Sequence, residues 1–164
     1  MKNILFICHG NICRSPAAEY LLKSKLAMHP ELSSHVQVIS RATSREELGH
    51  PIDSRMHQVL RQKGIDASAH RAQQVCQDEL VSADYLFVMD QHNERNLKRQ
   101  FDLASPKMKT KIQFLADLDP DTQNFPDRKK EISDPWYTLR FDAVVAQIDR
   151  AVTGLLHILE NEHL

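Results

Sequence analysis

An uninterrupted apolar segment close to the start of the chain, Asn3–Cys8, constrains the fold more than any other feature. A strand with one face in water alternates apolar and polar residues, whereas a strand buried on both faces of a parallel sheet does not. A turn at residues 9–11 follows, and a helical pattern begins near Ser15-Pro16, a favoured N-cap and a favoured first helical residue. Glu19 is then expected in the first turns, where an acid suits the helix dipole. This start predicts an α/β fold.

Strands and helices alternate along the rest of the chain. Short apolar segments predict three further strands, and capped or amphipathic segments predict three further helices. The strands are expected at Val36–Ile39, Tyr85–Met89 and Ile112–Leu115, and the helices at Ser54–Lys63, at Asp90–Arg99 and from Phe141 to Leu159. Such an alternation implies right-handed crossovers. We therefore expect residues 1–164 to form a single domain, a doubly wound four-stranded parallel sheet with helices on both faces.

The charge and the cysteine content exclude several classes of protein. Lys plus Arg total 21 and Asp plus Glu total 22, so the chain shows no basic footprint for nucleic acid or an anionic membrane. The N-terminal apolar segment is shorter than the about 20 residues of a membrane span and lacks a small-residue cleavage site. Three cysteines do not make a disulfide framework here, which favours a reducing compartment. We expect a cytoplasmic monomer without nucleic-acid or membrane partners.

Nucleotide and metal sites are not predicted. The chain has four glycines and contains neither G-x-G-x-x-G nor G-x-x-x-x-G-K-[ST], the glycine-rich loops that bind nucleotide phosphates. Its nine histidines are scattered, without H-E-x-x-H or paired C-x-x-C spacing. We therefore expect no cofactor and no metal.

The segment between the first strand and the first helix has the composition of an anion-binding loop. It lies at the C-terminal end of a strand, where open α/β sheets place their ligands. Backbone N–H groups of a tight loop and a helix N-terminus together attract an anion. Glycine, and to a lesser degree asparagine, tolerates the unusual backbone angles of such a loop, and an arginine matches two phosphate oxygens. The predicted phosphate-binding loop is Cys8, His9, Gly10, Asn11, Ile12, Cys13, Arg14 and Ser15.

Cys8 is the candidate nucleophile of this loop. A helix N-terminus and Arg14 favour a thiolate, which beside a phosphate ester is positioned for in-line attack at phosphorus. The N–H groups and Arg14 then hold the equatorial oxygens, and Ser15 can hydrogen-bond the thiolate. The alternative is a buried cysteine that packs as a small hydrophobe, the usual role of cysteine at a strand end. Cys76 is expected to be such a packed residue.

A proton donor for the leaving group is expected in the long connection Leu118–Pro135, which holds three prolines and several acids. Asp134 is the main candidate because Pro135 restricts its backbone, while Trp136 and Tyr137 can form a wall for an aromatic leaving group. Asp119, Asp121 and Asp127 are rivals from the same connection. From spacing alone, Asp134 can equally be a turn residue before the last helix, with Trp136 packed in the core.

Taken together, these residues resemble the low-molecular-weight protein tyrosine phosphatase family. Cys8–Pro16 matches the family's C-x-G-N-I-C-R-S-P loop, and Asp134–Tyr137 matches its Asp-Pro-aromatic-aromatic segment. Ser40–Thr43 is similar to its S-A-x-T, and Gly49–Arg55 fits its G-x-P-x-D-x-R. The resemblance implies a metal-independent hydrolase that acts through a cysteinyl-phosphate on phosphotyrosine proteins or small aryl phosphates and releases inorganic phosphate.

The resemblance also implies residue roles. Cys8 would be the nucleophile, Arg14 the phosphate clamp, and Asp134 the acid and then the base for the hydrolytic water. A supporting hydrogen-bond network would comprise Asn11, Ser15, Ser40 and His70. Cys13 would be the family's second cysteine, which can trap oxidised Cys8 as a reversible disulfide.

Departures from the family pattern concern specificity. Arg41 replaces a small residue, and Gln73 stands where arginine is common. The position at the pocket rim that often carries an aromatic residue falls at Glu46, beside Glu47, so acidic flanks of a substrate peptide are expected to be disfavoured.

Three other functions remain open as alternatives. Arsenate reductases of the same fold use two further downstream cysteines, and only Cys76 lies downstream here. Protein arginine phosphatases tend to have threonine at Ile12 and to lack the aromatic of Tyr137, so both residues favour phosphotyrosine. A non-catalytic phosphate-binding module would need neither the thiol nor the acid.

Overall fold

The computed structural model describes residues 1–124 and 130–163. Its centre is a parallel sheet of four strands in the order β2-β1-β3-β4: β1 (Lys2–Cys8), β2 (Val36–Ala42), β3 (Tyr85–Val88) and β4 (Ile112–Phe114). The predicted four-stranded parallel sheet is confirmed. Strand β1 pairs with β2 on one side and β3 on the other, so it lies in the interior of the sheet.

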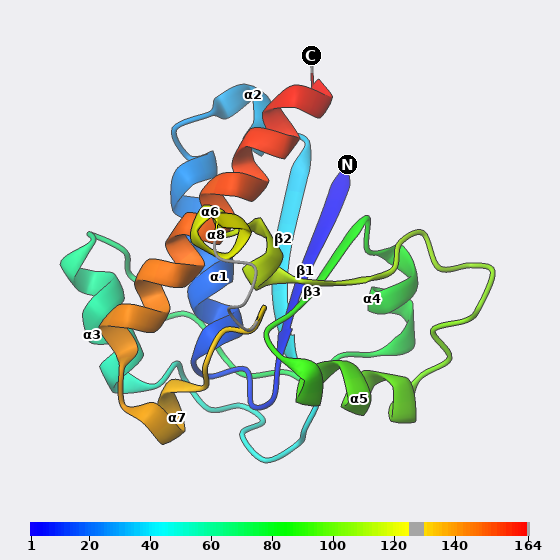
Figure 1. Ribbon diagram of the computed structural model, residues 1–164, viewed down its shortest axis with the longest axis horizontal. Coiled ribbons are helices and arrows are strands. Elements are labelled where there is room, and N and C mark those ends of the chain that lie inside the picture. Colours follow the sequence, from blue (N-terminus) through cyan, green and yellow to red (C-terminus); the bar gives the residue numbers. More distant parts are fainter. Residues whose placement is uncertain (125–129, 164) are drawn as a thin grey trace.

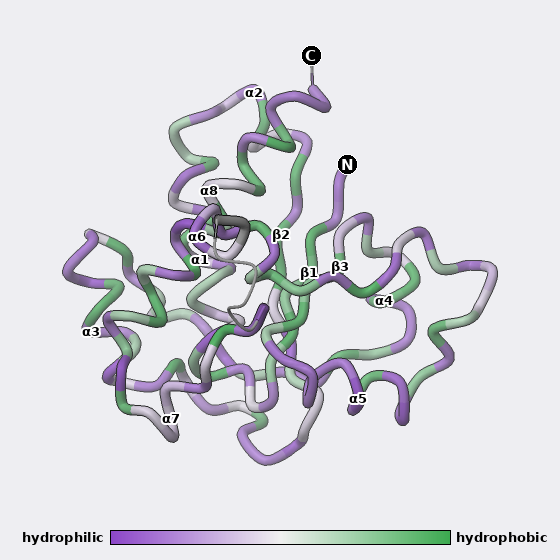
Figure 2. Tube along the Cα trace, in the orientation of Figure 1, coloured by the Kyte–Doolittle hydropathy of each residue, from purple (hydrophilic) through white to green (hydrophobic). Residues whose placement is uncertain are grey.

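Helices cover both faces of this sheet (Figure 1). One face packs against α1 (Arg14–Leu26), α3 (Ser54–Gln62) and α8 (Phe141–His163), and the other against α4 (Gln77–Ser82) and α5 (Gln91–Gln100). Ile4 and Phe6 of β1 belong to the first core, while Leu5 and Ile7 belong to the second. Both faces of β1 are therefore buried, which explains its unbroken apolar sequence and the hydrophobic colour of its lower part in Figure 2.

Short helices occupy connections that the sequence pattern left irregular. Besides α4, they are α2 (Pro30–Ser33), the 3₁₀ helix η1 (Leu115–Leu118), α6 (Pro120–Asn124) and α7 (Pro135–Thr138). The predicted long loop Leu118–Pro135 is thus helical at its start. There Asp119, a rival candidate acid, accepts two hydrogen bonds from Arg150 at 2.9 and 3.1 Å and serves to hold α6 and η1 against α8. Another rival, Asp127, lies outside the described residues.

The start of α1 differs from the sequence-based expectation. The helix begins at Arg14, and no side chain caps it. Ser15 is not the N-cap, because its hydroxyl bonds to groups of the preceding loop. Glu19 lies beyond the first turn and is buried, where it accepts a hydrogen bond from Ser40. The caps of α3 and α5 follow the usual chemistry, with Asp53 and Asp90 as their N-cap residues.

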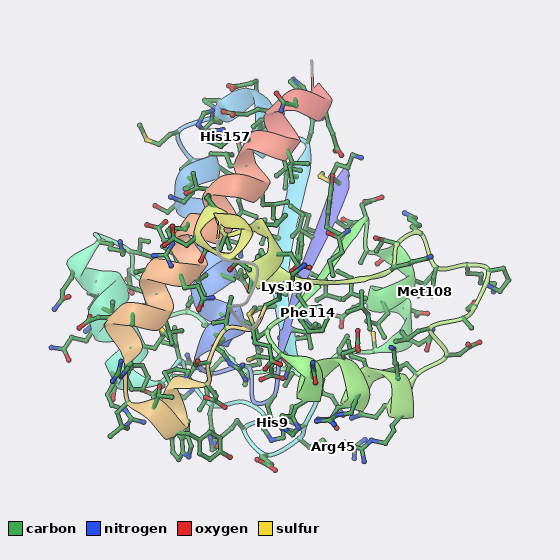
Figure 3. All side chains as sticks on the ribbon, in the orientation of Figure 1. His9, Arg45, Met108, Phe114, Lys130 and His157 are labelled. Carbon is green, nitrogen blue, oxygen red and sulfur yellow. The ribbon has the colours of Figure 1, made fainter. Side chains whose placement is uncertain are left out.

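The parallel sheet brings the C-terminal ends of its strands to one end of the molecule. His9 and Arg45, which follow β1 and β2, lie at this end together with α7, whereas His157 of α8 lies at the other end (Figures 1 and 3). Among the described helices, none combines the length and the apolar character needed to cross a membrane.

Candidate active site

A cavity of about 450 Å³ opens at this end of the sheet. It brings together the loop after β1 with residues from the connection after β2 and from the segment around α7. The residues that line it are Cys8, His9, Gly10, Ile12, Cys13, Arg14, Glu46, Glu47, Asp134, Trp136 and Tyr137. The main predicted nucleophile, clamp, acid and rim residues therefore share one cavity, although the nucleophile Cys8 and the acid Asp134 are 126 positions apart in the sequence.

The backbone of the loop is oriented for an anion. Five of its carbonyl groups accept hydrogen bonds from the surrounding scaffold. In a planar trans peptide the next N–H points opposite to the carbonyl, so the N–H groups of residues 9, 10, 12, 13 and 14 face the inside of the loop. The outward bonds run to Cys8 from Thr43, to His9 from Ser44, to Asn11 from His70, to Ile12 from Asp53 and to Cys13 from Ala17, at 2.7–3.1 Å.

One residue of the loop has a left-handed backbone. It is Asn11, with φ of 59°, whereas Gly10 is not among the residues with positive φ. Asparagine tolerates this region better than other residues with a β-carbon. The left-handed conformation therefore falls on Asn11 and not on Gly10, although both residues could adopt it. The cost of this conformation is offset by the fully buried side chain of Asn11, which makes three hydrogen bonds.

Cys8 lies buried at the centre of the loop. Its Sγ is 2.9 Å from Ser15 Oγ and accepts the Asn11 N–H at 3.3 Å. Both contacts bring hydrogen-bonding groups up to the sulfur.

A chain of hydrogen bonds gives Ser15 a defined direction. The Glu19 carboxylate accepts the hydroxyl hydrogen of Ser40 at 2.7 Å, so Ser40 Oγ is left as the acceptor for Asn11 Nδ2 at 2.9 Å. The second hydrogen of Asn11 Nδ2 goes to Ser15 Oγ at 2.8 Å, which leaves the Ser15 hydroxyl hydrogen for Cys8 Sγ. Glu19 was missed as a site residue, although an acid in an apolar helix face is the signal that could have shown it.

Two contacts fix the Asn11 side chain and backbone in place. The Gln73 N–H donates to Asn11 Oδ1 at 3.1 Å, which settles which side of the amide carries the oxygen. His70 Nε2 donates to the Asn11 carbonyl at 2.7 Å. The structure thus brings together all four residues of the predicted supporting network: Asn11, Ser15, Ser40 and His70.

Replacing His70 with glutamine is expected to reduce the loss of stability that the protein shows on mild acidification. The pKa of His70 lies below 6.5, mainly because the ring is buried; Arg41 and Lys23 lower it further. The hydrogen bond to the Asn11 carbonyl and the charge of Glu19 act in the opposite direction but are outweighed. As the pH falls below 6.5, the unfolded chain therefore binds a proton at position 70 before the folded protein does. This preference lowers the free energy of unfolding by up to about 1 kcal/mol between pH 6.5 and 5.5.

Urea unfolding of the wild type and His70→Gln at pH 7.5 and 5.5 measures this contribution. The variant should lose less stability between the two pH values, since the other histidines are common to both proteins. Equal losses in both would contradict the role assigned to His70 in the pH dependence.

Arg14 is held rigidly from the side opposite the cavity. Its Nη1 donates to Asp90 Oδ2 at 2.6 Å and to the Ile132 carbonyl at 2.9 Å, which leaves Nε and Nη2 as the donors for a ligand anion. Burial lowers the pKa of Arg14, but Cys8, Asp90 and Asp134 outweigh it and raise the pKa above its usual value. Burial raises the pKa of Asp90, but Arg14 outweighs it and holds this pKa below its usual value. The pair therefore stays charged.

Asp134 stands at the edge of the cavity beside Arg14. Its Oδ2 is 3.5 Å from Arg14 Nη2, and its Oδ1 accepts the Trp136 N–H at 3.0 Å. Asp134 is thus the N-cap of α7 and also lines the cavity, so the two alternatives for this residue do not exclude each other. Trp136 is 54% exposed and Tyr137 is 81% exposed. The alternative in which Trp136 packs in the core is therefore wrong, and both rings form a wall of the cavity.

Acidic side chains from the connection after β2 also line the cavity. Glu46 and Glu47 line the cavity, and each lies beside a histidine: Glu46 Oε2 is 3.1 Å from His9 Nε2, and Glu47 Oε2 is 2.6 Å from His50 Nδ1. Two carboxyl groups thus stand at the edge of the cavity, each in contact with a histidine.

The remaining cysteines differ in environment. Cys13 is a buried free thiol that lines the cavity, and burial, followed by Asp53 and Cys8, raises its pKa well above the usual range. Cys76 is exposed at the N-terminus of α4, so the expectation that it packs in the core is wrong. Within residues 1–124 and 130–163, no group of three or more His, Cys, Asp or Glu side chains could hold a metal ion.

Comparison with known proteins places this geometry in a family. The model of the family "Low molecular weight phosphotyrosine protein phosphatase" matches residues 3–164. The human protein of that name is 38% identical over 157 residues, which cover 94% of each chain. The crystal structure of YfkJ from Bacillus subtilis superposes with a TM-score of 0.85 at 29% identity, covering 99% of this chain and 96% of that one.

A related structure carries a different name. The crystal structure of DARP, described as a Drosophila arginine phosphatase, superposes with a TM-score of 0.82 at 27% identity and covers 96% of each chain. The family match over nearly the whole length agrees with the loop, the cavity and the sheet described above. The chain belongs to the low molecular weight phosphotyrosine protein phosphatase family.

Proposed function

We propose that this protein hydrolyses phosphotyrosine in proteins, and small aryl phosphates, through a cysteinyl-phosphate intermediate. One observation carries the proposal: Cys8, Arg14 and Asp134 line the same cavity as the inward-facing N–H groups of the loop. Binding an anion requires neither a thiol nor a carboxyl group, whereas phosphoryl transfer to sulfur uses both.

In the first step, Cys8 Sγ attacks phosphorus as the thiolate, and the bond from phosphorus to the leaving oxygen breaks. Protonated Asp134 gives its proton to that oxygen, which departs as the phenol. The N–H groups of the loop and the Nε and Nη2 donors of Arg14 hold the three equatorial oxygens, where charge accumulates in the transition state.

In the second step, water attacks the phosphorus of the cysteinyl-phosphate. Asp134, now a carboxylate, accepts the proton of that water, and the bond from phosphorus to sulfur breaks. Inorganic phosphate is released, and Cys8 returns as a thiolate that the Ser15 hydroxyl stabilises by donating its hydrogen. The direction of the network from Glu19 to Ser15 supports this donation.

Hydrolysis of p-nitrophenyl phosphate without added metal tests the proposal. We expect turnover that is unaffected by a chelator and is inhibited by vanadate, which mimics the five-coordinate phosphorus of the transition state. A purified, folded wild type without turnover would refute the enzymatic function and favour a phosphate-binding module.

A protein arginine phosphatase is the second candidate, because the arginine phosphatase DARP is a structural neighbour. Ile12 and Tyr137 both line the cavity, where they supply an apolar edge and an aromatic wall. A phenyl ring packs on both surfaces, whereas a charged guanidinium can stack on the aromatic ring but loses hydration against the apolar Ile12 side chain. Matched phosphotyrosine and phosphoarginine peptides should therefore be hydrolysed with a clear preference for phosphotyrosine, and the reverse preference would select the second candidate.

Removing the charges of Glu46 and Glu47 is expected to improve hydrolysis of phosphotyrosine peptides with acidic flanks. Where one acidic residue of the peptide lies about 4 Å from one of these two glutamates, the repulsion in water is about 1 kcal/mol, so kcat/KM for such a peptide should rise roughly fivefold in the Glu46→Gln, Glu47→Gln double variant. The gain should shrink in high salt and be absent for a neutral peptide. Glu31→Gln, an exposed change on α2, is the control. A gain of equal size for both peptides would contradict the electrostatic explanation.

Cys13 completes the proposal as a redox partner. If Cys8 is oxidised to the sulfenic acid, attack by Cys13 sulfur forms a disulfide and releases water. The raised pKa of Cys13 keeps it protonated, which slows this attack relative to an ordinary thiol.

A further inference from the structure

Arg55, in the first turn of α3, contacts the segment that carries Asp134. Its guanidinium carbon lies 5.4 Å from the ring centre of Trp136 and 4.7 Å from that of Phe141. Trp136 follows Asp134 by two residues in α7, and Phe141 is the first residue of α8. Arg55 therefore touches an aromatic ring on each side of the short connection between α7 and α8.

The guanidinium is itself held in place by Asp53. Arg55 Nε donates to Asp53 Oδ1 at 3.2 Å, and Nη2 donates to Oδ2 at 3.0 Å. Burial by itself raises the pKa of Asp53. The hydrogen bonds from the Arg55 side chain and from the backbone N–H groups of Arg55 and Met56 outweigh burial, so the pKa lies below its usual value. Asp53 stays ionised, so the pair keeps its planar two-point geometry.

The same aspartate is joined to the phosphate-binding loop. The Asp53 N–H donates to the Ile12 carbonyl at 2.8 Å, one of the bonds that turn the loop carbonyls outward. A continuous series of contacts thus runs from the Ile12 backbone through Asp53 and Arg55 to Trp136. It connects the loop that holds the phosphate to the segment that holds the proton donor.

In the described part of the chain, Ile132 anchors the backbone just before Asp134, because it is buried and bonded to Arg14 and Met89, whereas α7 itself has few packing contacts. Within α7 only Pro135 is buried, and Trp136, Tyr137 and Leu139 are among the exposed large hydrophobic residues. Asp134 itself is 3.5 Å from Arg14, longer than a good hydrogen bond. A helix of four residues with one buried side chain has little packing to fix its position.

We propose that Arg55, held by Asp53, is a positioning residue that sets where Asp134 stands relative to the phosphate-binding loop. The inference rests on the proposed function, in which Asp134 protonates the leaving oxygen. Arg55 touches no reacting atom and acts through Trp136. Because a displacement of about 1 Å can cost roughly 10²-fold in rate, loss of this contact should be visible in catalysis.

The test compares Arg55→Ala with the wild type on two aryl phosphates of different leaving-group acidity. Alanine keeps the backbone N–H that Asp53 Oδ1 accepts, so the cap of α3 is retained. With phenyl phosphate, whose leaving oxygen needs the proton, kcat should fall about tenfold; with 2,4-dinitrophenyl phosphate, which departs without it, kcat should change by less than about twofold. Arg55→Lys keeps the charge and loses the planar stacking surface, so it should recover only part of the difference.

Trp136 offers a readout that does not depend on activity, since it is the one tryptophan of the chain. In Arg55→Ala, and in Asp53→Asn, its fluorescence should shift to the red and be quenched more strongly by acrylamide, because the ring loses the guanidinium that covers it. Arg61→Ala, an exposed change on the same helix, is the control and should alter neither readout.

The outcomes separate the inference from the proposed function. Equal kcat losses with both substrates, or an unchanged Trp136 signal in Arg55→Ala, would overturn the positioning role while leaving the phosphatase function intact. A wild type that hydrolyses neither substrate would overturn the proposed function and this inference with it. A selective loss with phenyl phosphate together with the shifted Trp136 signal would support the inference.

Discussion

Replacing Cys8 with serine is expected to lower kcat by at least about 10⁴-fold while phosphate binding stays within a few-fold of the wild type. The anion contacts come from the loop N–H groups and from Arg14, and the substitution removes neither. A serine hydroxyl, however, is not ionised near neutral pH, and the described residues around position 8 supply hydrogen-bond donors rather than a base. The variant should therefore bind a phosphotyrosine peptide without turning it over.

Steady-state kinetics with p-nitrophenyl phosphate and calorimetry with inorganic phosphate measure the two effects separately. Cys76→Ser is the matched control, because Cys76 is exposed and does not line the cavity. It should keep full activity. Turnover by Cys8→Ser within about tenfold of the wild type would exclude Cys8 as the nucleophile. The binding-competent variant can also be used to capture phosphotyrosine proteins from a lysate and identify them by mass spectrometry.

Replacing Asp134 with asparagine is expected to lower kcat by about 10²–10³-fold for phenyl phosphate and by much less for 2,4-dinitrophenyl phosphate. Asparagine keeps the size of the side chain and an oxygen for the Trp136 N–H, so α7 retains its N-cap. It has no proton to give to the leaving oxygen. The loss should therefore follow the basicity of the leaving group.

A series of aryl phosphates with graded leaving-group acidity measures this dependence. Asp121→Asn is the control, since Asp121 is a rival acid from the same connection and lies 3.5 Å from Arg150, outside the cavity. It should leave the series unchanged. Equal losses across the series in Asp134→Asn would show that Asp134 shapes the site without donating a proton.

Local chemistry in the sequence was enough to predict the elements that position the site. The unbroken apolar segment at Asn3–Cys8 predicted a strand buried on both faces, and β1 lies between β2 and β3. The patterns at Ser54–Lys63 and Asp90–Arg99 predicted α3 and α5 to within one residue at each end. Where the three-dimensional shape of a loop decides which groups a side chain meets, the same reasoning failed. Ser15 looks like an N-cap by its neighbours, but Cys8 and Asn11 take its hydroxyl.

The sequence by itself determined the chemistry available to this protein: a thiol, an arginine and a tight turn between a buried strand and a helix, and a carboxyl group held by a following proline. These follow from residue types within a few positions of one another, because strand burial, turns and caps are decided by near neighbours. What holds those groups was decided only by the tertiary structure. Arg14 is paired with Asp90, 76 positions away, and bonds the Ile132 carbonyl, 118 positions away. Such pairs depend on the order of the strands and on which helices pack together, and no local pattern encodes that arrangement.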